Sequence, residues 1–292
     1  MKPGFERIES PAPGIYYNVP MAEYLAWDAW SRSDIAAMQI SPEFCHWHRF
    51  TKEDKDTDAT SFGDLAHTAL LEPHLWPPTD VRWIEGPYNR NPMKAERSEA
   101  QAQGYRVFKP EIKTTVEKLV KRCREHDYIR ALLDMSGDER EVSAIAVCPV
   151  SGLTLKARCD LRTPKINVIA DLKTTGNGTD RHAFQRSMSK WNWHLSGPHY
   201  TEVFGLAEGR EYDHYLFLVT AQEEPFQPRV YSLDPETMEA GRDLNHMLRR
   251  KVVACLASGV WPAGPEEIEP VGMPYWTKNE IAEALEREAQ EN

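Results

Sequence analysis

The spacing of apolar residues changes character along this chain. Apolar side chains first recur at helical spacing, then alternate with polar ones as in strands, and then return to helical spacing. Helices are predicted over residues 31–40, 61–72, 110–134, 181–207 and 235–258, and strands over residues 14–19, 141–150, 153–161, 166–173, 213–220 and 230–232. This order predicts an α/β fold with a mixed central β-sheet flanked by helices.

Length and composition predict one globular domain. The chain has 292 residues, of which 41% are hydrophobic and 27% charged, an ordinary globular mixture. We expect a single domain over residues 1–292, with an N-terminal helical region at 1–60, a core at 61–262 and an acidic C-terminal tail or helix at 263–292. Residues 73–105 are rich in Pro, Asn, Arg and Gln, which predicts a long loop with some helix.

Signals for membranes, secretion and metal clusters are weak in this sequence. No apolar run approaches the ~18 residues that a membrane span needs. Residues 1–14 carry acids and prolines in place of the apolar core of a signal peptide. The five cysteines are scattered and form no CxxC pair, which favours reduced thiols over a zinc ribbon or a clustered iron–sulfur site. We therefore expect a cytoplasmic protein without a membrane partner.

Charge is unevenly distributed along the chain. The formal net charge is −10, which by itself disfavours a nucleic-acid partner. Residues 153–200, however, contain eight Lys and Arg and three Asp, a net charge of +5, whereas residues 266–292 contain eight acids and two basic residues. Because salt screens charges beyond about 10 Å, the basic segment can still form a local anion-binding face.

Strand alternation identifies the main candidate site. Within 153–161, Asp160 lies on the polar face, and within 166–173, Asp171 and Lys173 share a face. If the two strands are neighbours, two carboxylates and an ammonium group converge. Adjacent carboxylates repel unless a cation lies between them, and their oxygens suit Mg²⁺ or Mn²⁺. A surface hairpin with alternating charges is the plain alternative, but the apolar strand makes buried charges costly unless they have a function.

A histidine and a polar turn are further candidates. Gly63 and His67 lie one helical turn apart, so they share a helix face, and glycine permits close approach to a neighbour. A buried, hydrogen-bonded structural histidine is the ordinary alternative. The run Thr174-Thr175-Gly176-Asn177-Gly178 follows the strand with Lys173, which indicates either backbone exposed to a ligand or a simple turn.

Together these motifs resemble the PD-(D/E)XK nuclease superfamily and, more narrowly, the nuclease domain of RecE (exonuclease VIII) from phage and prophage recombination systems. The similarity covers most of the chain and is specific in the order and spacing of its motifs. The matching motifs are Gly14-Ile15-Tyr16-Tyr17, Ser31-Arg32-Ser33, Gly63 to His67, Leu71-Glu72-Pro73, Arg158-Cys159-Asp160, Ala170 to Thr175, Trp193-His194-Leu195 to Tyr200, Phe217-Leu218-Val219 and Trp261-Pro262.

The resemblance implies a metal-dependent exodeoxyribonuclease. It implies that His67, Asp160, Asp171 and the Leu172 carbonyl hold a catalytic Mg²⁺, for which Mn²⁺ can substitute, and that Lys173 positions the attacking water. The implied reaction degrades linear double-stranded DNA from its 5′ ends in a bacterial or phage-infected cell. The products would be 3′ single-stranded tails for recombination.

DNA-binding residues are also implied. Ser31, Arg32 and Ser33 open a helix, where they could anchor a 5′-phosphate within the region 1–60; an ordinary helix cap is at least as good an explanation. The remaining candidates for DNA or phosphate binding are Arg158, Thr174, Thr175 and Tyr200.

One departure from the family pattern leaves alternatives open. Relatives carry a QxxxY motif, whereas this chain has Ser196 at the glutamine position before Tyr200. Pro198 should kink or restart the helix there, and His194 or His199 could take over the missing contacts. The departure motivates an alternative function, a DNA-end-binding recombination factor of the same fold with weak or no cleavage. A third hypothesis keeps the nuclease but changes the substrate to single strands, RNA or internal sites.

The resemblance further implies a ring-like homo-oligomer and a single-strand annealing protein as partner. A ring would gather the basic faces around a central channel and turn acidic surfaces outward, which reconciles the charge of −10 with a DNA substrate. We expect light scattering of the purified protein to give an oligomeric mass. A monomer at every concentration would contradict the ring.

Overall fold

The computed structural model describes residues 7–51, 58–86, 91–264 and 267–291. The chain comprises two compact units, Met1–Pro262 and Ala263–Asn292. In the described part of the first unit, a six-stranded sheet has the order β1-β4-β5-β6-β7-β8. The second unit contains helix α11 (Tyr275–Glu291).

The sheet is mixed, as predicted. Its strands are β1 (Gly14–Tyr16), β4 (Arg140–Val147), β5 (Thr154–Thr163), β6 (Val168–Thr175), β7 (His214–Ala221) and β8 (Pro228–Ser232). Neighbours pair antiparallel except β6 and β7, which are parallel. A parallel pair needs a long crossover, and helices α8 (Arg181–Lys190) and α9 (Ser196–Glu208) lie in that connection.

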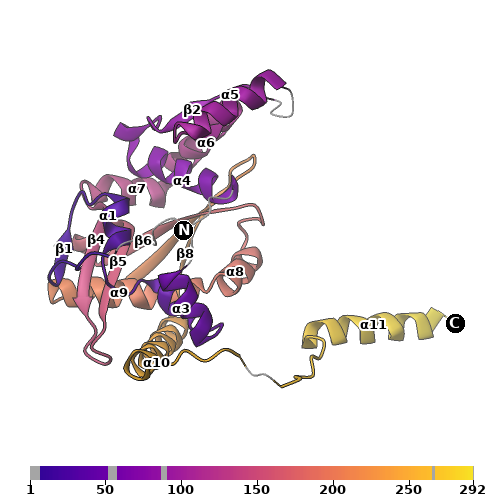
Figure 1. The fold of residues 1–292 in the computed structure, drawn as a ribbon. Helices are drawn as coiled ribbons and strands as arrows, with labels where there is room; N and C mark the ends of the chain where they lie inside the picture. Colours follow the sequence, from indigo (N-terminus) through magenta and orange to yellow (C-terminus); the bar gives the residue numbers. More distant parts are fainter. Residues whose placement is uncertain (1–6, 52–57, 87–90, 265–266, 292) are drawn as a thin grey trace. The chain divides into compact units, whose positions relative to one another are not determined.

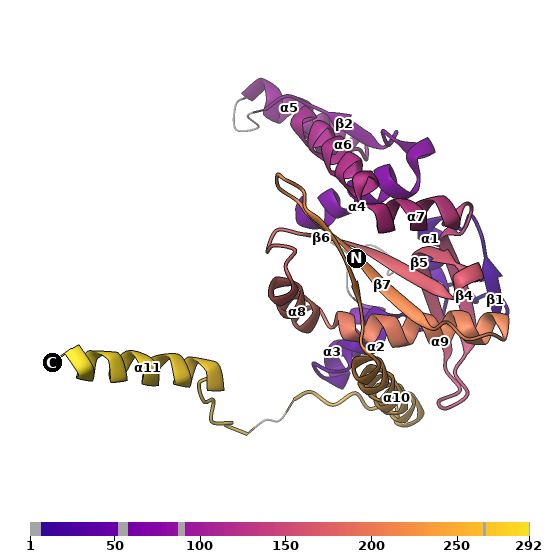
Figure 2. The same cartoon turned by 180° about the vertical axis from the view of Figure 1, so that it is seen from behind.

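Helices cover both faces of the sheet (Figures 1 and 2). On one face lie α4 (Asp58–Leu71), α6 (Pro110–Glu125) and α7 (Asp127–Ser136); on the other lie α2 (Arg32–Ala37), α3 (Pro42–Phe50), α9 and α10 (Pro235–Ser258). Successive residues of β6 point to opposite faces, so Ile169 belongs to one apolar core and Ala170 to the other. This two-sided burial confirms the predicted α/β architecture.

The long loop predicted over residues 73–105 contains more structure than expected. It holds the 3₁₀ helix η1 (Pro73–Leu75), strand β2 (Val81–Trp83) and helix α5 (Asn91–Ala102). Strand β2 pairs in parallel with β3 (Arg106–Phe108). Each strand has three residues, which is too short for an alternating pattern to be recognised in the sequence.

Two predicted helices are divided in the structure. The helix expected over 110–134 breaks at His126, whose extended backbone separates α6 from α7. The helix expected over 181–207 becomes α8, the 3₁₀ helix η3 (Trp193–Leu195) and α9. Pro198 lies in the first turn of α9, where its missing N–H has no helical acceptor to lose, so the predicted restart occurs here.

Two short helices remain, α1 (Met21–Ala26) and the 3₁₀ helix η2 (Pro164–Ile166).

The five cysteines are buried and form no disulfide. Among the described residues, no helix combines the length and the apolar character that a membrane crossing requires.

Candidate active site

The candidate site forms where strands β5 and β6 diverge. Their backbone ladder ends at the pair Leu161 and Ala170. The N–H of Leu172 then donates to the Asp160 carboxylate, with an N···O distance of 2.5 Å. A side chain thus replaces the backbone acceptor that a neighbouring strand would supply, so Asp160 sits in the opening between the two strands.

Helix α4 places His67 over this opening. His67 Nε2 lies 3.0 Å from the Leu172 carbonyl oxygen, so this nitrogen donates, because a carbonyl oxygen only accepts. His67 Nδ1 lies 3.5 Å from Asp160 Oδ2. One turn earlier, Gly63 faces Thr174 of β6, where an added Cβ would lie 3.5 Å from the hydroxyl oxygen. That is an ordinary contact, so the approach of helix and strand does not depend on glycine.

Asp171 and Lys173 form the other half of the site. Lys173 Nζ lies 2.6 Å from Asp171 Oδ2, and their side chains are 20% and 7% exposed, respectively. The ammonium group also lies 5.6 Å from the centre of the Trp193 ring, which orients it by a cation–π contact. The structure therefore brings together the four side chains His67, Asp160, Asp171 and Lys173.

The two aspartates titrate as a coupled pair. Burial raises the pKa of Asp160 well above its usual value, and the charge of Asp171 raises it further. Burial would also raise the pKa of Asp171, but Lys173 outweighs it and lowers that pKa. Burial lowers the pKa of His67 below its usual value, which favours the neutral imidazole. A divalent cation beside Asp160 would therefore stabilise its ionised form.

Glu141 in β4 is a member of the site that the sequence did not reveal. Ligand atoms of His67, Glu141 and Asp160 all lie within 4.8 Å of one another. The backbone φ of Glu141 is 52°, an uncommon value for a residue other than glycine and one that is often found at functional sites. Its position between the β4–β5 pairs Arg140–Leu161 and Val142–Cys159 places it opposite Asp160. Only the strand register reveals this proximity.

These donors fit a hard divalent cation. Carboxylate oxygens of Asp160 and Glu141 and the Leu172 carbonyl are the ligand types that Mg²⁺ and Mn²⁺ prefer, and His67 Nδ1 adds one imidazole nitrogen. Burial also raises the pKa of Glu141, so a cation would stabilise both carboxylates at once. Asp171, also a predicted ligand, forms the ion pair with Lys173 in this structure, and metal binding by Asp171 stays a prediction.

The predicted phosphate anchor at residues 31–33 forms a helix cap. The Ser31 side chain accepts from the N–H of Asp34, and the Asp34 carboxylate accepts from the N–H of Ser31. Arg32 donates to the Trp191 carbonyl over 3.4 Å, and the hydroxyl of Ser33 lies 2.9 Å from that of Ser31. Capping accounts for this arrangement, and phosphate binding by Ser31, Arg32 and Ser33 stays a prediction.

Three other predicted DNA-binding residues contact protein groups. Arg158 donates to Glu141 Oε2 over 2.8 Å, so its guanidinium is turned inward beside the site. Thr174 accepts from the side chain of Gln222, and Thr175 accepts from the N–H of Asn177. The two threonine contacts lie at the turn after β6.

Helix α9 carries Tyr200, the remaining predicted DNA-binding residue. The Tyr200 ring lies 5.8 Å from that of Tyr215 and packs against the apolar core. Ser196, at the glutamine position of the family motif, is buried. His199 is also buried, with Nε2 on the Lys156 carbonyl and Nδ1 beside Arg249, so it does not replace that glutamine. His194, the other candidate to replace that glutamine, is partly buried.

Comparison with known proteins identifies relatives of this arrangement. Residues 32–272 match the family described as "PDDEXK-like domain of unknown function (DUF3799)". A candidate exonuclease from Eubacterium rectale has a similar structure, with a TM-score of 0.56 and 13% identity over 84% of this chain and 91% of that chain. A phage-related exonuclease from Haemophilus somnus 129PT gives a TM-score of 0.32 and 12% identity over 79% and 96% of the two chains. No curated protein matched.

The raised pKa of Asp160 generates a stability prediction. Asp160→Asn keeps an oxygen for the Leu172 N–H but removes a carboxylate whose ionisation burial and Asp171 oppose. In EDTA at neutral pH we expect its free energy of unfolding to exceed the wild-type value by about 1 kcal/mol, since one pKa unit corresponds to about 1.4 kcal/mol. This difference should shrink as the pH falls below the raised pKa, and it should vanish only below the ordinary carboxyl pKa of about 3.9, where Asp160 is protonated in both the folded and the unfolded state.

Mn²⁺ should reverse this order of stability. At a Mn²⁺ concentration 100-fold above its Kd, the wild type should gain about 2.7 kcal/mol and Asp160→Asn far less. Urea unfolding followed by circular dichroism, in EDTA and in Mn²⁺, measures both effects. Asp138→Asn, at an exposed acid, is the matched control and should behave as the wild type. Equal Mn²⁺ responses in wild type and Asp160→Asn would contradict the assignment.

Proposed function

Because the chain belongs to the family of PDDEXK-like domains, we propose that it is a metal-dependent nuclease that hydrolyses phosphodiester bonds of linear double-stranded DNA. The observation that carries the proposal is the convergence of His67, Asp160, Asp171 and Lys173 at the opening between β5 and β6. Paired acids beside a lysine, in a partly exposed site, are suited to phosphoryl chemistry.

Each residue of the candidate active site would have a separate role. Asp160, Glu141 and His67, with the Leu172 carbonyl, would hold the cation, which when bound polarises a phosphoryl oxygen and lowers the pKa of a water molecule. Asp171 and Trp193 orient the Lys173 ammonium, which can donate hydrogen bonds to the attacking water or to the phosphate oxygens. His67 holds the Leu172 carbonyl in place through its Nε2 proton.

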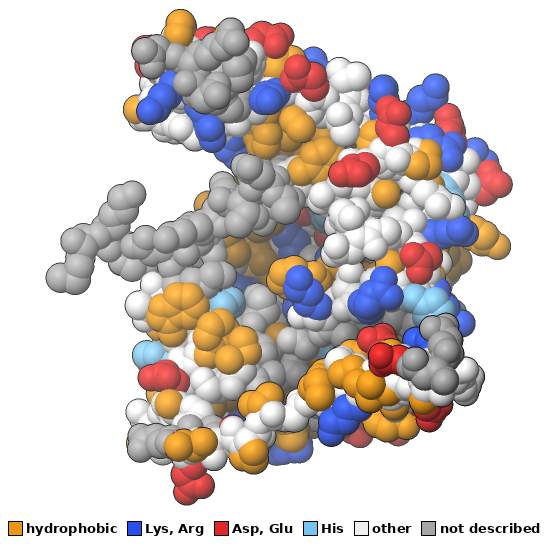
Figure 3. All heavy atoms as spheres, turned by 90° about the vertical axis from the view of Figure 1, so that its right-hand side faces the viewer, with side chains coloured by type: hydrophobic (Ala, Val, Ile, Leu, Met, Phe, Trp, Pro, Cys, Tyr) orange, Lys and Arg blue, Asp and Glu red, His pale blue; other side chains and the backbone are white. Residues whose placement is uncertain are grey.

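The segment that follows β6 in sequence lines a basic pocket. It has a volume of about 220 Å³ and is lined by Asn177, Ala183, Arg186, Ser187 and Lys190. Figure 3 shows Lys and Arg side chains around a hollow on the face of the first unit that lies to the right in Figure 1. These cations, on the segment that follows the acidic site in sequence, would contact the DNA backbone while the scissile phosphate binds at the metal site.

The narrower proposal is an exodeoxyribonuclease that acts from 5′ ends and leaves 3′ tails for recombination, with Mg²⁺ as its cofactor. It is supported by the RecE-like order of the motifs and by the description of the similar Eubacterium rectale structure as an exonuclease. A ring-like assembly and a single-strand annealing partner belong to the same proposal. The alternative is a DNA-end-binding factor without cleavage, motivated by Ser196 at the glutamine position.

Nuclease activity should depend on the lysine and its ion-pair partner. We expect Asp171→Ala and Lys173→Ala each to lower the rate by about 10²–10⁴-fold, because each removes a group that orients or stabilises the reacting atoms. The assay measures release of nucleotides from linear duplex in Mg²⁺ and in Mn²⁺. Lys165→Ala, at an exposed lysine of η2, is the matched control and should retain full activity. Full activity in both site variants would show that this site is not the catalytic one.

Substrate ends distinguish the forms of this proposal. Linear duplex should be degraded far faster than closed circles. A label at the 5′ end of a strand should be released earlier than a label at its 3′ end. Equal attack on circles would indicate internal cutting, and preference for single strands or RNA would change the substrate class. Stable binding to ends with no product in either metal would favour the binding factor.

The basic pocket should control affinity more than chemistry. Removing both charges with Arg186→Ala and Lys190→Ala should weaken duplex binding and lower the salt dependence of log Kd by about 1 for each lost phosphate contact. The rate at saturating DNA should change little. The matched control removes Arg250 and Lys251, two exposed basic residues of α10. Identical salt dependence in the wild type and the pocket variant would contradict this role.

A further inference from the structure

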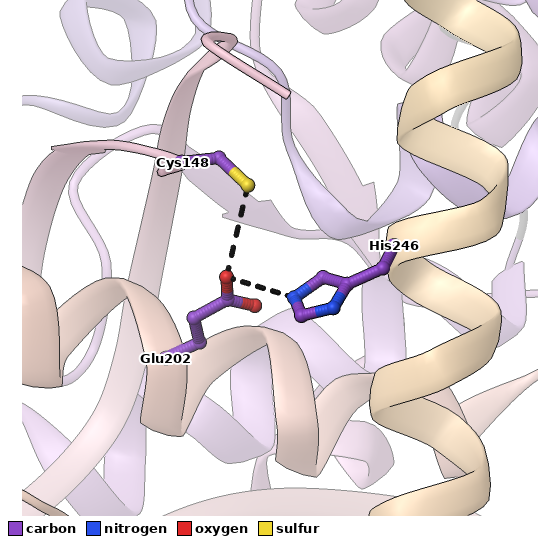
Figure 4. A group of neighbouring side chains, drawn as sticks. All are labelled: Cys148, Glu202 and His246. Atoms are coloured by element: carbon purple, nitrogen blue, oxygen red, sulfur yellow. Dashed lines mark hydrogen bonds and ion pairs between the residues drawn. The ribbon is translucent and has the colours of Figure 1, made fainter. Parts of the chain in front are cut away.

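A second group of potential metal ligands lies where strand β4 ends against helices α9 and α10 (Figure 4). Cys148 follows the last residue of β4, Glu202 comes from α9 and His246 from α10. Glu141 of the candidate active site lies near the other end of β4. Seven residues of extended chain, at about 3.3 Å each, separate Cys148 from Glu141 by roughly 23 Å, so the two groups are distinct sites.

The three side chains point at one another. Cys148 Sγ lies 3.8 Å and His246 Nε2 lies 3.2 Å from the same oxygen, Glu202 Oε1. The ligand atoms of all three residues lie within 4.8 Å of one another. In a tetrahedral zinc site with bonds of about 2.0–2.3 Å, neighbouring ligand atoms are about 3.3–3.6 Å apart. Small side-chain movements would therefore complete three corners of such a site.

Arg249 orients the carboxylate of this group. Its Nη1 donates to Glu202 Oε2 over 2.6 Å, which leaves Oε1 to face Cys148 and His246. Its Nη2 lies 3.2 Å from Nδ1 of His199, whose Nε2 in turn donates to the Lys156 carbonyl. Buried partners that hold a ligand in place from behind are typical of metal sites.

Charge and access also suit a cation. Arg249 offsets the charge of Glu202, and the Cys148 thiol gives up one proton to solvent when a metal–sulfur bond forms, so the group with Zn²⁺ carries a net charge of +1. Cys148 is buried, whereas the side chains of Glu202 and His246 are 14% and 20% exposed. A water molecule can reach the fourth corner from that side.

We propose that Cys148, Glu202 and His246 form a zinc site that ties the end of β4 to helices α9 and α10. A thiolate and an imidazole select Zn²⁺ over the harder Mg²⁺. The inference is independent of the proposed nuclease function, since it uses none of the residues of that site. Its competing explanation is a network of hydrogen bonds and ion pairs without metal.

The test measures zinc binding by the full chain. Zn²⁺ is titrated in competition with a chromophoric chelator in excess Mg²⁺, and Co²⁺ is added separately to look for thiolate-to-cobalt charge-transfer absorption. All proteins carry Asp160→Asn, which removes a ligand of the candidate active site. We expect one Zn²⁺ per chain and affinity at least about 100-fold weaker in Cys148→Ser and His246→Gln, since even second-shell changes cost about 10–100-fold. Cys255→Ser and His182→Gln are matched controls and should bind as the parent does.

Three results would overturn the zinc site. They are stoichiometric binding that survives Cys148→Ser and His246→Gln, Co²⁺ spectra without the thiolate band, and no zinc binding by the parent protein. X-ray absorption of the zinc-loaded parent needs no variant at the site and should show one sulfur ligand, so the test remains decisive even if Cys148→Ser fails to fold. Nuclease assays report separately on the other site, so the failure of one proposal is distinguishable from the failure of the other.

Discussion

The candidate active site depends on the hydrogen bond between the Asp160 carboxylate and the N–H of Leu172. It forms where β5 and β6 stop pairing, so a charged side chain satisfies a backbone donor that would otherwise face an open gap. His67 lies over the same gap, where its Nε2 donates to the Leu172 carbonyl oxygen. Burying a second carboxylate beside Asp160 opposes ionisation of the pair, and this electrostatic strain is the property that makes the site a good host for a cation.

Strand β4 connects the two groups of potential metal ligands. Glu141 near its start faces Asp160, whereas Cys148 after its end faces Glu202 and His246. The helices that supply the partners lie on opposite faces of the sheet: α4 brings His67 to one group, and α9 and α10 bring Glu202 and His246 to the other. The donor sets differ in the same way, since one is mainly oxygen and suits Mg²⁺ or Mn²⁺, and the other contains a thiolate and suits Zn²⁺.

Local charge, rather than net charge, governs the expected interaction with DNA. The chain is acidic overall, yet Arg186 and Lys190 line a pocket in the segment that follows the site. Because salt screens distant charges, acidic residues elsewhere weaken this local field only slightly. Arg158 shows the limit of counting charges along the sequence, since its guanidinium neutralises Glu141 inside the protein instead of facing a ligand.

The sequence by itself determined the order of the main helices and strands and the face that Asp171 and Lys173 share, because alternation along a strand is a local property. Only the pairing of β5 with β6 in the tertiary structure brings Asp160 to them. Only the tertiary structure decided that Glu141 joins the site, that Arg158 turns inward, and that Cys148, Glu202 and His246 meet. The divisions at His126 and before α9, and the short β2–β3 pair, also became visible only there. The physical reason is that strand register and helix packing join residues far apart in the chain, and no local pattern of side chains encodes those distances.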